Sequence, residues 1–270
     1  MRRDTTAMPF KFIHLTDPHF VAGDGLLYGL DPRARLAAAI ASINDAHADA
    51  AFCVVTGDLA HWGEPGAYVR LAEALGRLRI PFHLLLGNHD GRAAFREAFP
   101  AVPVDSDGHV QRAIETPLGR FVFLDSNEPG ASWGVLCERR LCWLAATLAE
   151  RPEERPSIFV HHPPFGVGIR PMDRIALRET ARFAEVLMAH PGGIRHLFFG
   201  HLHRPVSGSW RGIPFSTLRA TNHQVWLDLR DTDAVPGSRE PPQYAVVLME
   251  ADLTVVHLHD YLDGTHGFVL

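Results

Sequence analysis

Short clusters of histidine, aspartate and asparagine recur along the chain, each directly after an apolar run. The clearest is Gly87-Asn88-His89-Asp90, which follows the leucine-rich run 80–86. Side chains of these types bind metal ions and transfer protons. A single cluster of this kind is more often a turn or a helix cap than a functional site. The other clusters decide between these interpretations.

Four more clusters occupy the same position after an apolar run. The candidate metal ligands in all five are Asp17, His19, Asp58, Asn88, His161, His201 and His203. Because open α/β sheets bind their ligands at the carboxyl ends of the strands, we expect the clusters to meet at one edge. Coincidence explains five such clusters in succession poorly, so the sequence predicts one metal centre.

The ligand types limit the choice of metal. Carboxylates, an amide oxygen and imidazoles without a thiolate favour Mn, Fe, Co or Zn ions. Seven ligands exceed the three or four that one tetrahedral zinc ion takes from a protein. They suit two metal ions, divalent or trivalent, about 3.5–4 Å apart with a shared carboxylate. Asp58 is the expected bridge, because a carboxylate has two oxygens and its strand should lie between the other two N-terminal strands.

The elements that must position these clusters alternate between strand and helix in the first half of the chain. Asp31 and Pro32 form a typical helix start, with an aspartate cap and proline at the first helical position. We predict strands at 10–15, 51–56, 80–86, 157–160 and 194–199, and helices at 32–47, 65–78, 92–99, 138–148 and 173–190. A hairpin at 109–124 and four strands of an antiparallel sheet at 206–210, 213–218, 243–249 and 254–259 complete the pattern.

This order predicts the α/β class, with two packed mixed β-sheets flanked by helices. We expect a single domain over residues 1–270, in which 204–270 supplies the C-terminal antiparallel strands. The polar, Pro- and Gly-containing stretch 231–242 is long enough to be either a functional loop or a disordered one.

Composition narrows the function classes. The net charge is −5 and no Lys/Arg run stands out, which argues against a nucleic acid polymer as partner. The three cysteines have neither redox nor zinc-site spacing and fit a reducing cytoplasm. Residues 1–6 are charged and polar, without the apolar region of a signal peptide, and no apolar stretch reaches the ~18 residues of a membrane span. We therefore expect a cytoplasmic protein that does not enter a membrane.

The five clusters, in this order, resemble the five motifs of the calcineurin-like metallophosphoesterases. The matching motifs are Asp17-x-His19, Gly57-Asp58, Gly87-Asn88-His89-Asp90, His161-His162 and Gly200-His201-x-His203, and they span about residues 12–203. Within that family, the stretches 26–29, 161–164 and 222–225 are most similar to the cyclic-nucleotide and glycerophosphodiester phosphodiesterase branch, and to its bacterial glycerophosphodiesterases in particular.

The resemblance implies a role for each position. The first metal would be held by Asp17, His19, Asp58 and His203, and the second by Asp58, Asn88, His161 and His201. His89 would contact the phosphate or protonate the leaving alkoxide, and Asp90 would orient His89. The fold would be the four-layer metallophosphoesterase sandwich, and the C-terminal segment would act as a cap or in a homo-oligomer, a dimer or larger.

Substrate contacts are less clear, and the candidates are Tyr28, His61 and His223. His61 stands where family members often carry Asp or Asn, and Trp62 follows it, so the local contacts are open. The Asp-Arg-Gly and post-GNH glutamate of protein Ser/Thr phosphatases are absent, which argues against a phosphoprotein substrate.

The predicted function is binuclear metal-dependent hydrolysis of small phosphodiesters, of glycerophosphodiester or cyclic nucleotide type. A hydroxide formed from metal-bound water would attack phosphorus. His89, Asp58 and Asn88 are the candidate catalytic residues. The alternative is a phosphomonoesterase or nucleotide pyrophosphatase of the same family, and a more remote one is a non-catalytic scaffold.

Overall fold

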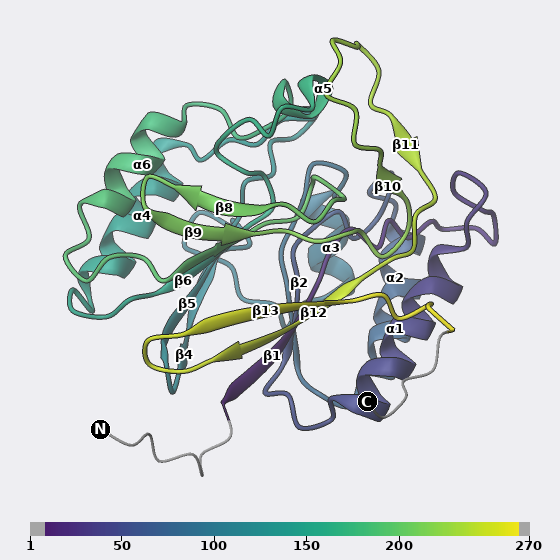
Figure 1. The fold of residues 1–270 in the computed structure, drawn as a ribbon, viewed down its shortest axis with the longest axis horizontal. Coiled ribbons are helices and arrows are strands. Elements are labelled where there is room, and N and C mark those ends of the chain that lie inside the picture. Colours follow the sequence, from purple (N-terminus) through teal and green to yellow (C-terminus); the bar gives the residue numbers. More distant parts are fainter. Residues whose placement is uncertain (1–8, 265–270) are drawn as a thin grey trace, which may run out of the picture.

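Two mixed β-sheets pack face to face, with helices on both outer sides, in the computed structural model, which describes residues 9–264 (Figure 1). The segment 1–6, discussed above for its lack of a signal peptide, lies outside the described residues. The first sheet has the order β13-β12-β1-β2-β3 and the second has the order β4-β5-β6-β7-β9-β8. The predicted α/β class with two packed mixed sheets is confirmed.

The bounds of the elements follow the apolar runs. The first sheet consists of β1 (Phe10–Leu15), β2 (Cys53–Val55), β3 (Phe82–Leu84), β12 (Tyr244–Met249) and β13 (Thr254–His259). The second consists of β4 (Arg112–Thr116), β5 (Gly119–Leu124), β6 (Ser157–Val160), β7 (His196–Phe198), β8 (Ser207–Trp210) and β9 (Ile213–Ser216). The helices are α1 (Pro32–Ala46), α2 (Pro65–Leu75), α3 (Arg92–Ala98), α4 (Glu138–Ala149), α5 (Arg170–Asp173) and α6 (Thr180–Met188). A small ribbon pairs β10 (Gln224–Val225) with β11 (Gly237–Ser238).

Alternate residues of the central strands face opposite layers, as expected for strands buried on both sides. In β1, Phe12 packs between the two sheets, whereas Ile13 packs with the core beneath α1 and α2. Phe159 of β6 stacks between Phe123 and Phe198, with ring centroids 5.0 and 4.7 Å away. Each aromatic pair contributes about 0.5–1.5 kcal/mol beyond the area it buries. Phe12 of β1 packs edge-on against Phe159 and Phe198, with ring centroids 5.8 and 5.5 Å away, so aromatic contacts also join the two sheets.

The strands that carry the clusters have the predicted order. β2 lies between β1 and β3, and both pairings are parallel. In the second sheet, β6 pairs in parallel with both β5 and β7. The carboxyl ends of neighbouring parallel strands therefore lie at the same edge of each sheet.

The prediction of one helix over 173–190 is wrong. The segment forms the short α5 and the separate α6, and the chain between them consists of turns and bends with an isolated β-bridge between Leu177 and Gly134. There the N–H of Leu177 donates to Pro163 O over 3.0 Å, and the N–H of Arg178 donates to Gly134 O over 2.9 Å. These tertiary hydrogen bonds replace the helical ones, and helix propensity alone does not reveal them.

The prediction that the four C-terminal strands form one antiparallel sheet is also wrong. β12 and β13 extend the first sheet beside β1, whereas β9 joins β7 in parallel and β8 closes that edge of the second sheet. The stretch 231–242 contains β11 and is thus partly ordered as a ribbon. Within residues 9–264, no helix is long and apolar enough to cross a membrane.

Candidate metal centre

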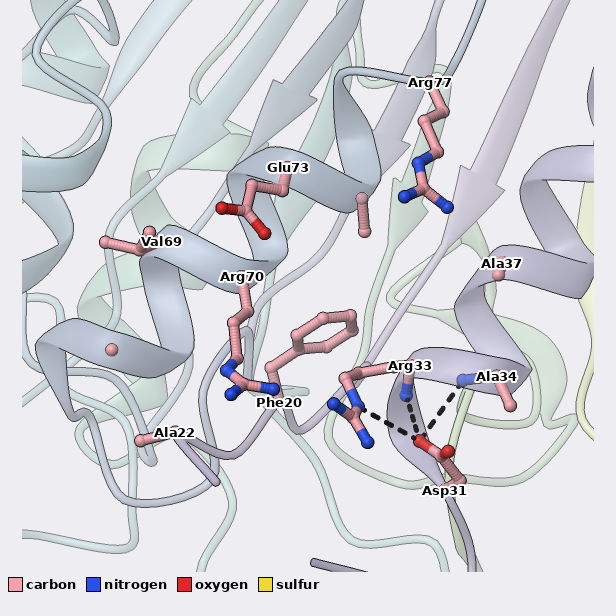
Figure 2. A pocket seen from close by; sticks show the side chains of 12 residues that line it. Phe20, Ala22, Asp31, Arg33, Ala34, Ala37, Val69, Arg70, Glu73 and Arg77 are labelled. Atoms are coloured by element: carbon pink, nitrogen blue, oxygen red, sulfur yellow. Dashed lines mark hydrogen bonds and ion pairs between the residues drawn. The ribbon is translucent and has the colours of Figure 1, made fainter. Parts of the chain in front are cut away.

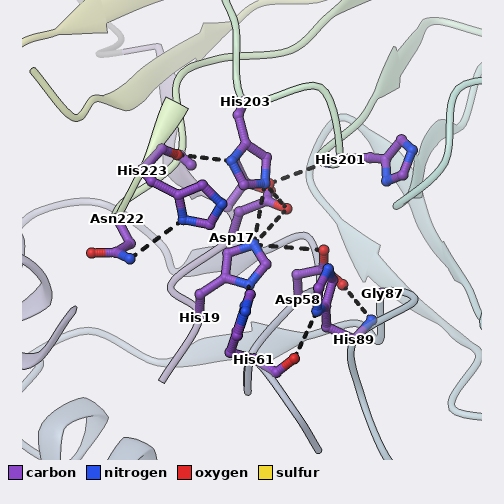
Figure 3. Close-up of polar contacts among 12 residues, drawn as sticks. Asp17, His19, Asp58, His61, Gly87, His89, His201, His203, Asn222 and His223 are labelled. Atoms are coloured by element: carbon purple, nitrogen blue, oxygen red, sulfur yellow. Dashed lines mark hydrogen bonds and ion pairs between the residues drawn. The ribbon is translucent and has the colours of Figure 1, made fainter. Parts of the chain in front are cut away.

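All seven predicted ligands lie at one end of the sandwich, where five strands end. Figure 3 shows Asp17, His19, Asp58, His201 and His203 among them. The seven ligands come from the segments after β1, β2, β3, β6 and β7. Six of them are buried, with at most 5% of the residue surface exposed, and Asn88 is half-buried. The structure therefore brings together the residues that the strand-end argument expected to meet.

The first set of ligands is Asp17, His19, Asp58 and His203, which the structure groups as residues able to share one ion. His203 Nε2 lies 3.1 Å from Asp17 Oδ1 and 3.2 Å from His19 Nε2. His203 Nδ1 donates to the backbone carbonyl of His223, so its Nε2 lone pair is free to face the carboxylate. A lone pair this close to a carboxylate oxygen requires a shared cation, either a proton or a metal ion.

The second set meets the first at Asp58. Asp58 Oδ2 lies 3.7 Å from His19 Nε2 and 3.4 Å from His161 Nε2, so one oxygen faces both sets. The other oxygen, Oδ1, accepts the N–H of His89. The sequence argument assigned one oxygen of Asp58 to each metal, whereas the geometry offers Oδ2 to both. Asn88 Oδ1 and His201 Nδ1 lie 3.1 Å apart and complete the second set.

Buried atoms without hydrogen bonds test whether the centre fits metal ions. Asp17 Oδ1, His161 Nε2 and His201 Nε2 are buried and have no hydrogen-bond partner among the described residues. Such atoms are costly unless a ligand satisfies them. The donor set, with its nitrogen and oxygen atoms and no sulfur, is the one that Mn, Fe, Co and Zn ions accept. The residues therefore fit a pair of such ions.

Electrostatics supports the same conclusion. Burial lowers the pKa of His161, but Asp58, with smaller contributions from Asp17 and the carbonyl of Thr56, outweighs burial and raises the pKa to about 9. Burial would likewise raise the pKa of Asp58, but His161 and His89 hold it well below its usual value. The carboxylate is thus ionised and attracts positive charge. For His201, burial and the neighbouring His161 keep the pKa well below 6.5, so this imidazole is neutral and able to bind a metal.

Most of these ligands sit in strained backbone conformations. Asp17, His19, Asp58, His201 and His203 all have φ between +47° and +65°. The left-handed region costs a non-glycine residue of order 1–3 kcal/mol in such settings, and it persists where the surroundings impose it. Here each strand end turns sharply to aim its side chain at the centre.

Position 87 has no space for a side chain, so it must be glycine. A Cβ at this position would lie 2.1 Å from Asp58 Oδ1 and 2.7 Å from His161 Cε1. The φ of Gly87 is not positive, so glycine is needed there for space and not for a left-handed backbone. Its role is to let the β3 end approach the bridging carboxylate.

His89 lies beside the ligands and stacks on His61, with ring centroids 4.7 Å apart. Its Nδ1 donates to the backbone carbonyl of His61 over 2.6 Å. This bond fixes the tautomer, so Nε2 is the atom available to a substrate.

The expected contact between Asp90 and His89 is not found. Both oxygens of Asp90 are used by other donors, namely the backbone N–H groups of Leu59, Ala60 and Gly87 and the hydroxyl of Tyr68. Asp90 therefore holds the β2 and β3 loops together, and the carbonyl of His61 orients His89 instead.

The three candidate substrate contacts lie beside the first ligand set. His223 lies 4.7 Å from both His19 and His203 between ring centroids, and Tyr28 lies 4.6 Å from His223. His61 Nδ1 is 3.0 Å from His19 Nδ1. All three line the same side of the centre.

Sequence reasoning missed the carboxyl end of β5. Asn127 Nδ2 donates to Gly87 O over 2.6 Å and to Asp90 O over 3.0 Å, so one side chain binds both ends of the turn that carries Asn88 and His89. The preceding Asp125, also buried, pairs bidentately with Arg92. The signal was an apolar run that ends in Asp125-Ser126-Asn127, the same pattern as the other strand ends but without histidine.

His162, the residue after His161, contacts Ser126, which belongs to the Asp125-Ser126-Asn127 segment after β5. His162 Nδ1 lies 2.8 Å from Ser126 Oγ, and burial lowers its pKa well below 6.5. Its ring is therefore neutral.

A cavity of about 790 Å³ lies between α1 and α2, away from the seven ligands (Figure 2). None of the seven ligands lines it. Two of its arginines are already paired, Arg33 with Asp31 at 3.5 Å and Arg70 with Asp24 at 2.7 Å. Size alone is therefore a poor guide, and the strand ends carry the chemistry.

Comparison with known proteins agrees with this geometry. A family model described as calcineurin-like phosphoesterase matches residues 10–205. A probable cyclic nucleotide phosphodiesterase of Rhodopseudomonas palustris is 51% identical over 258 residues, which cover 94% of each chain. A glycerophosphodiester phosphodiesterase of Enterobacter lignolyticus is 34% identical over 223 residues, which cover 81% of this chain and 80% of the relative. A solved dimetal phosphatase from Danio rerio has the same fold, with a TM-score of 0.68, 16% identity and coverage of 95% of this chain and 98% of that one.

Proposed function

Because the chain belongs to the calcineurin-like phosphoesterase family, we propose that it is a phosphoric diester hydrolase with a binuclear metal centre. Its substrates are small phosphodiesters of the cyclic nucleotide or glycerophosphodiester type, as the names of its relatives suggest. The observation that carries the proposal is that the ligand sets contain buried atoms without hydrogen-bond partners among the described residues, namely Asp17 Oδ1, His161 Nε2 and His201 Nε2. Of these, His161 Nε2 lies 3.4 Å from Asp58 Oδ2, the oxygen that faces both sets.

The residues divide into two ligand sets. Asp17, His19, Asp58 and His203 would hold the first ion, and Asp58, Asn88, His161 and His201 the second. Two bound ions supply water of lowered pKa and neutralise the charge on the phosphoryl oxygens. The metals that suit these donors are Fe, Mn, Zn and Co.

His89 then serves the leaving group. Its Nδ1 proton is committed to the carbonyl of His61, so its Nε2 faces the substrate. In the imidazolium form, Nε2 donates a hydrogen bond to the phosphate or a proton to the departing alkoxide. A general acid in this position typically accelerates a reaction 10²- to 10⁴-fold.

The proposal also covers the location, the domain organisation and the partners of the protein. The three cysteines are free, which fits the cytoplasm. The fold acts as one domain over the whole chain, in which 204–270 contributes a cap and a surface for a homo-oligomer. Several large apolar side chains of this segment are exposed by 48–63%, namely Trp226, Leu227, Leu229 and Val235, which supports such a contact. Neither a nucleic acid polymer nor a membrane is a partner.

The test compares chromogenic esters on metal-reconstituted protein. Bis(p-nitrophenyl) phosphate should be hydrolysed faster than p-nitrophenyl phosphate, and Asp58→Ala should abolish metal-dependent turnover. The exposed His257 provides a matched control, His257→Asn, which should retain activity. Preference for the monoester would favour a phosphomonoesterase, and turnover of neither ester with full metal content would favour a scaffold.

A further inference from the structure

A cavity of about 540 Å³ adjoins the metal centre on the side of His223. Its lining comes from two parts of the chain, the turn at Tyr28 and the segment that includes the β10–β11 ribbon, with Val225, Val235 and Arg239. His223 belongs both to this lining and to the surroundings of His19. A group attached to a phosphate at the centre would therefore extend into this cavity, whose size is in the range of pockets that hold drug-sized ligands.

Tyr28 presents its ring to the cavity from a rigid support. The residue is 58% exposed, and its backbone has φ of +55°, an unusual value for a bulky side chain. Leu27 and Leu30 close the turn with two backbone hydrogen bonds, of 2.8 and 3.0 Å, and Gly29 follows with φ of +79°. An exposed aromatic ring held in a strained turn beside a centre is a feature that local folding alone does not explain.

Arg239 fastens this turn to the ribbon. Its Nε donates to Tyr28 O over 3.0 Å. A Cβ at Gly29 would lie 2.7 Å from Arg239 Nη2, so glycine is needed there for the guanidinium as well as for the positive φ. No described carboxylate forms an ion pair with Arg239, and its terminal N–H groups are left for other acceptors.

We propose, on the premise of the phosphodiesterase function above, that this cavity binds a planar aromatic group of the substrate, such as a nucleobase. Tyr28 is the stacking surface, and Arg239 positions Tyr28 and donates to acceptor atoms at the edge of the ring. Every nucleobase has a flat π face and acceptor atoms on its edge. Val225 and Val235 offer apolar contact to a ring and no hydrogen bond to a glycerol. The protein therefore selects nucleotide diesters over glycerophosphodiesters.

The first experiment measures kcat and KM for 3′,5′-cyclic AMP and for glycerophosphoethanolamine in variants of the cavity. Tyr28→Ala should lower kcat/KM for cyclic AMP about 5- to 150-fold, mainly through KM. This loss corresponds to the binding free energy that stacking of a base on an aromatic side chain contributes. The glycerophosphodiester should change less than about twofold. Tyr28→Phe, which keeps the ring, should recover most of the kcat/KM that Tyr28→Ala loses, and Arg239→Gln should raise KM for cyclic AMP alone. His257→Asn, at an exposed position, should behave like the unaltered protein.

The second experiment separates this proposal from the catalytic one. Adenosine, which has no phosphate, should bind the metal-free protein in a calorimetric or NMR titration, and Tyr28→Ala should weaken that binding. The cavity assignment is overturned if adenosine does not bind, if its binding is the same in Tyr28→Ala, or if both diesters lose activity equally in that variant. Absence of all diester hydrolysis by the metal-loaded, unaltered protein would instead overturn the proposed function, while adenosine binding would still report on the cavity.

Discussion

The main-chain N–H of His89 donates to Oδ1 of Asp58 over 2.9 Å, which ties the expected acid to the expected bridge between the metals. Asp58 thus uses one oxygen to hold the turn of β3 and offers the other to His19 and His161. One carboxylate therefore has a structural function and a metal-binding function, and they can be separated by mutation.

Asp58→Asn should preserve the turn and lose the metal. The amide oxygen still accepts the N–H of His89, whereas a neutral amide is a poor bridge between two cations. We expect metal content, measured by atomic absorption, to fall below one equivalent and kcat/KM to fall by more than about 10²-fold. His257→Asn is the matched control. Full metal content with normal turnover in Asp58→Asn would contradict the bridging role.

His89→Gln should lower turnover without releasing metal. Its effect should depend on the leaving group, because only a basic alkoxide needs a proton as it departs. We expect a loss of about 10²- to 10⁴-fold for a glycerophosphodiester and a much smaller one for bis(p-nitrophenyl) phosphate. Equal losses for both substrates would leave His89 with a role in phosphate binding alone.

Asn127→Ala should weaken metal binding from outside the ligand set. The variant leaves the carbonyls of Gly87 and Asp90 without their donor, at a cost of about 1–3 kcal/mol in the free energy of unfolding. Because the turn also carries Asn88, metal affinity should fall about 10- to 100-fold. Gln111→Ala removes a part-buried hydrogen bond, to Asp105, that involves neither Gly87 nor Asp90. It should lower stability alone, and a matching loss of metal affinity in that control would refute the positioning role.

Gly87→Ala should disrupt the centre through steric contact. The added methyl group would lie 2.1 Å from Asp58 Oδ1, closer than any real contact allows, so the carboxylate or the turn must move. We expect a lower unfolding temperature and lost metal in titrations of the purified variant. Gly25→Ala, where no atom lies within 4 Å of the new Cβ, should behave like the unaltered protein. Normal metal affinity in Gly87→Ala would show that the site has more room than the structure indicates.

Two buried histidines outside the centre should make the protein acid-sensitive. Burial, together with His196, lowers the pKa of His14 to about 3, and burial lowers the pKa of His196 to about 4. The unfolded chain, with a histidine pKa near 6.5, takes up protons at a higher pH than the folded one. Stability is therefore complete above pH 6.5 and falls as the pH drops through this window, by about 2 kcal/mol per histidine at pH 5.

Urea denaturation of the metal-free protein at pH 7.5 and pH 5 measures this effect. Glutamine does not titrate, so His14→Gln should lose about 2 kcal/mol less than the unaltered protein over the same interval. An identical pH dependence in both proteins would rule out His14 as a source.

Local sequence predicts the parts of this molecule that depend on local pattern. The runs that became β1, β2 and β3 are apolar and end in polar clusters, so both the strands and the meeting of Asp17, Asp58 and Asn88 followed from the chain. What depends on distant partners did not follow. The residue types around these positions indicate neither the pairing of β12 with β1 nor the hydrogen bond from Leu177 to Pro163.

The same limit applies within the centre. Asn127 went unnoticed because an Asp-Ser-Asn cluster after a strand is common in ordinary turns, and only its bonds to Gly87 and Asp90 distinguish it. The resemblance implies that Asp90 orients His89, but in space the hydroxyl of Tyr68 and three backbone N–H groups donate to both oxygens of Asp90.

The ligands come from both halves of the sandwich, with Asp17, His19, Asp58 and Asn88 from the first sheet and the three remaining histidines from the second. Metal ions in the centre would thus fasten two sheets that otherwise meet through side-chain packing, much as a disulfide links distant parts of a chain. At a free metal concentration a hundred times the Kd, one such ion adds about 2.7 kcal/mol to stability. Metal scarcity in a cell would then shorten the lifetime of the protein against proteases, in addition to slowing its reaction.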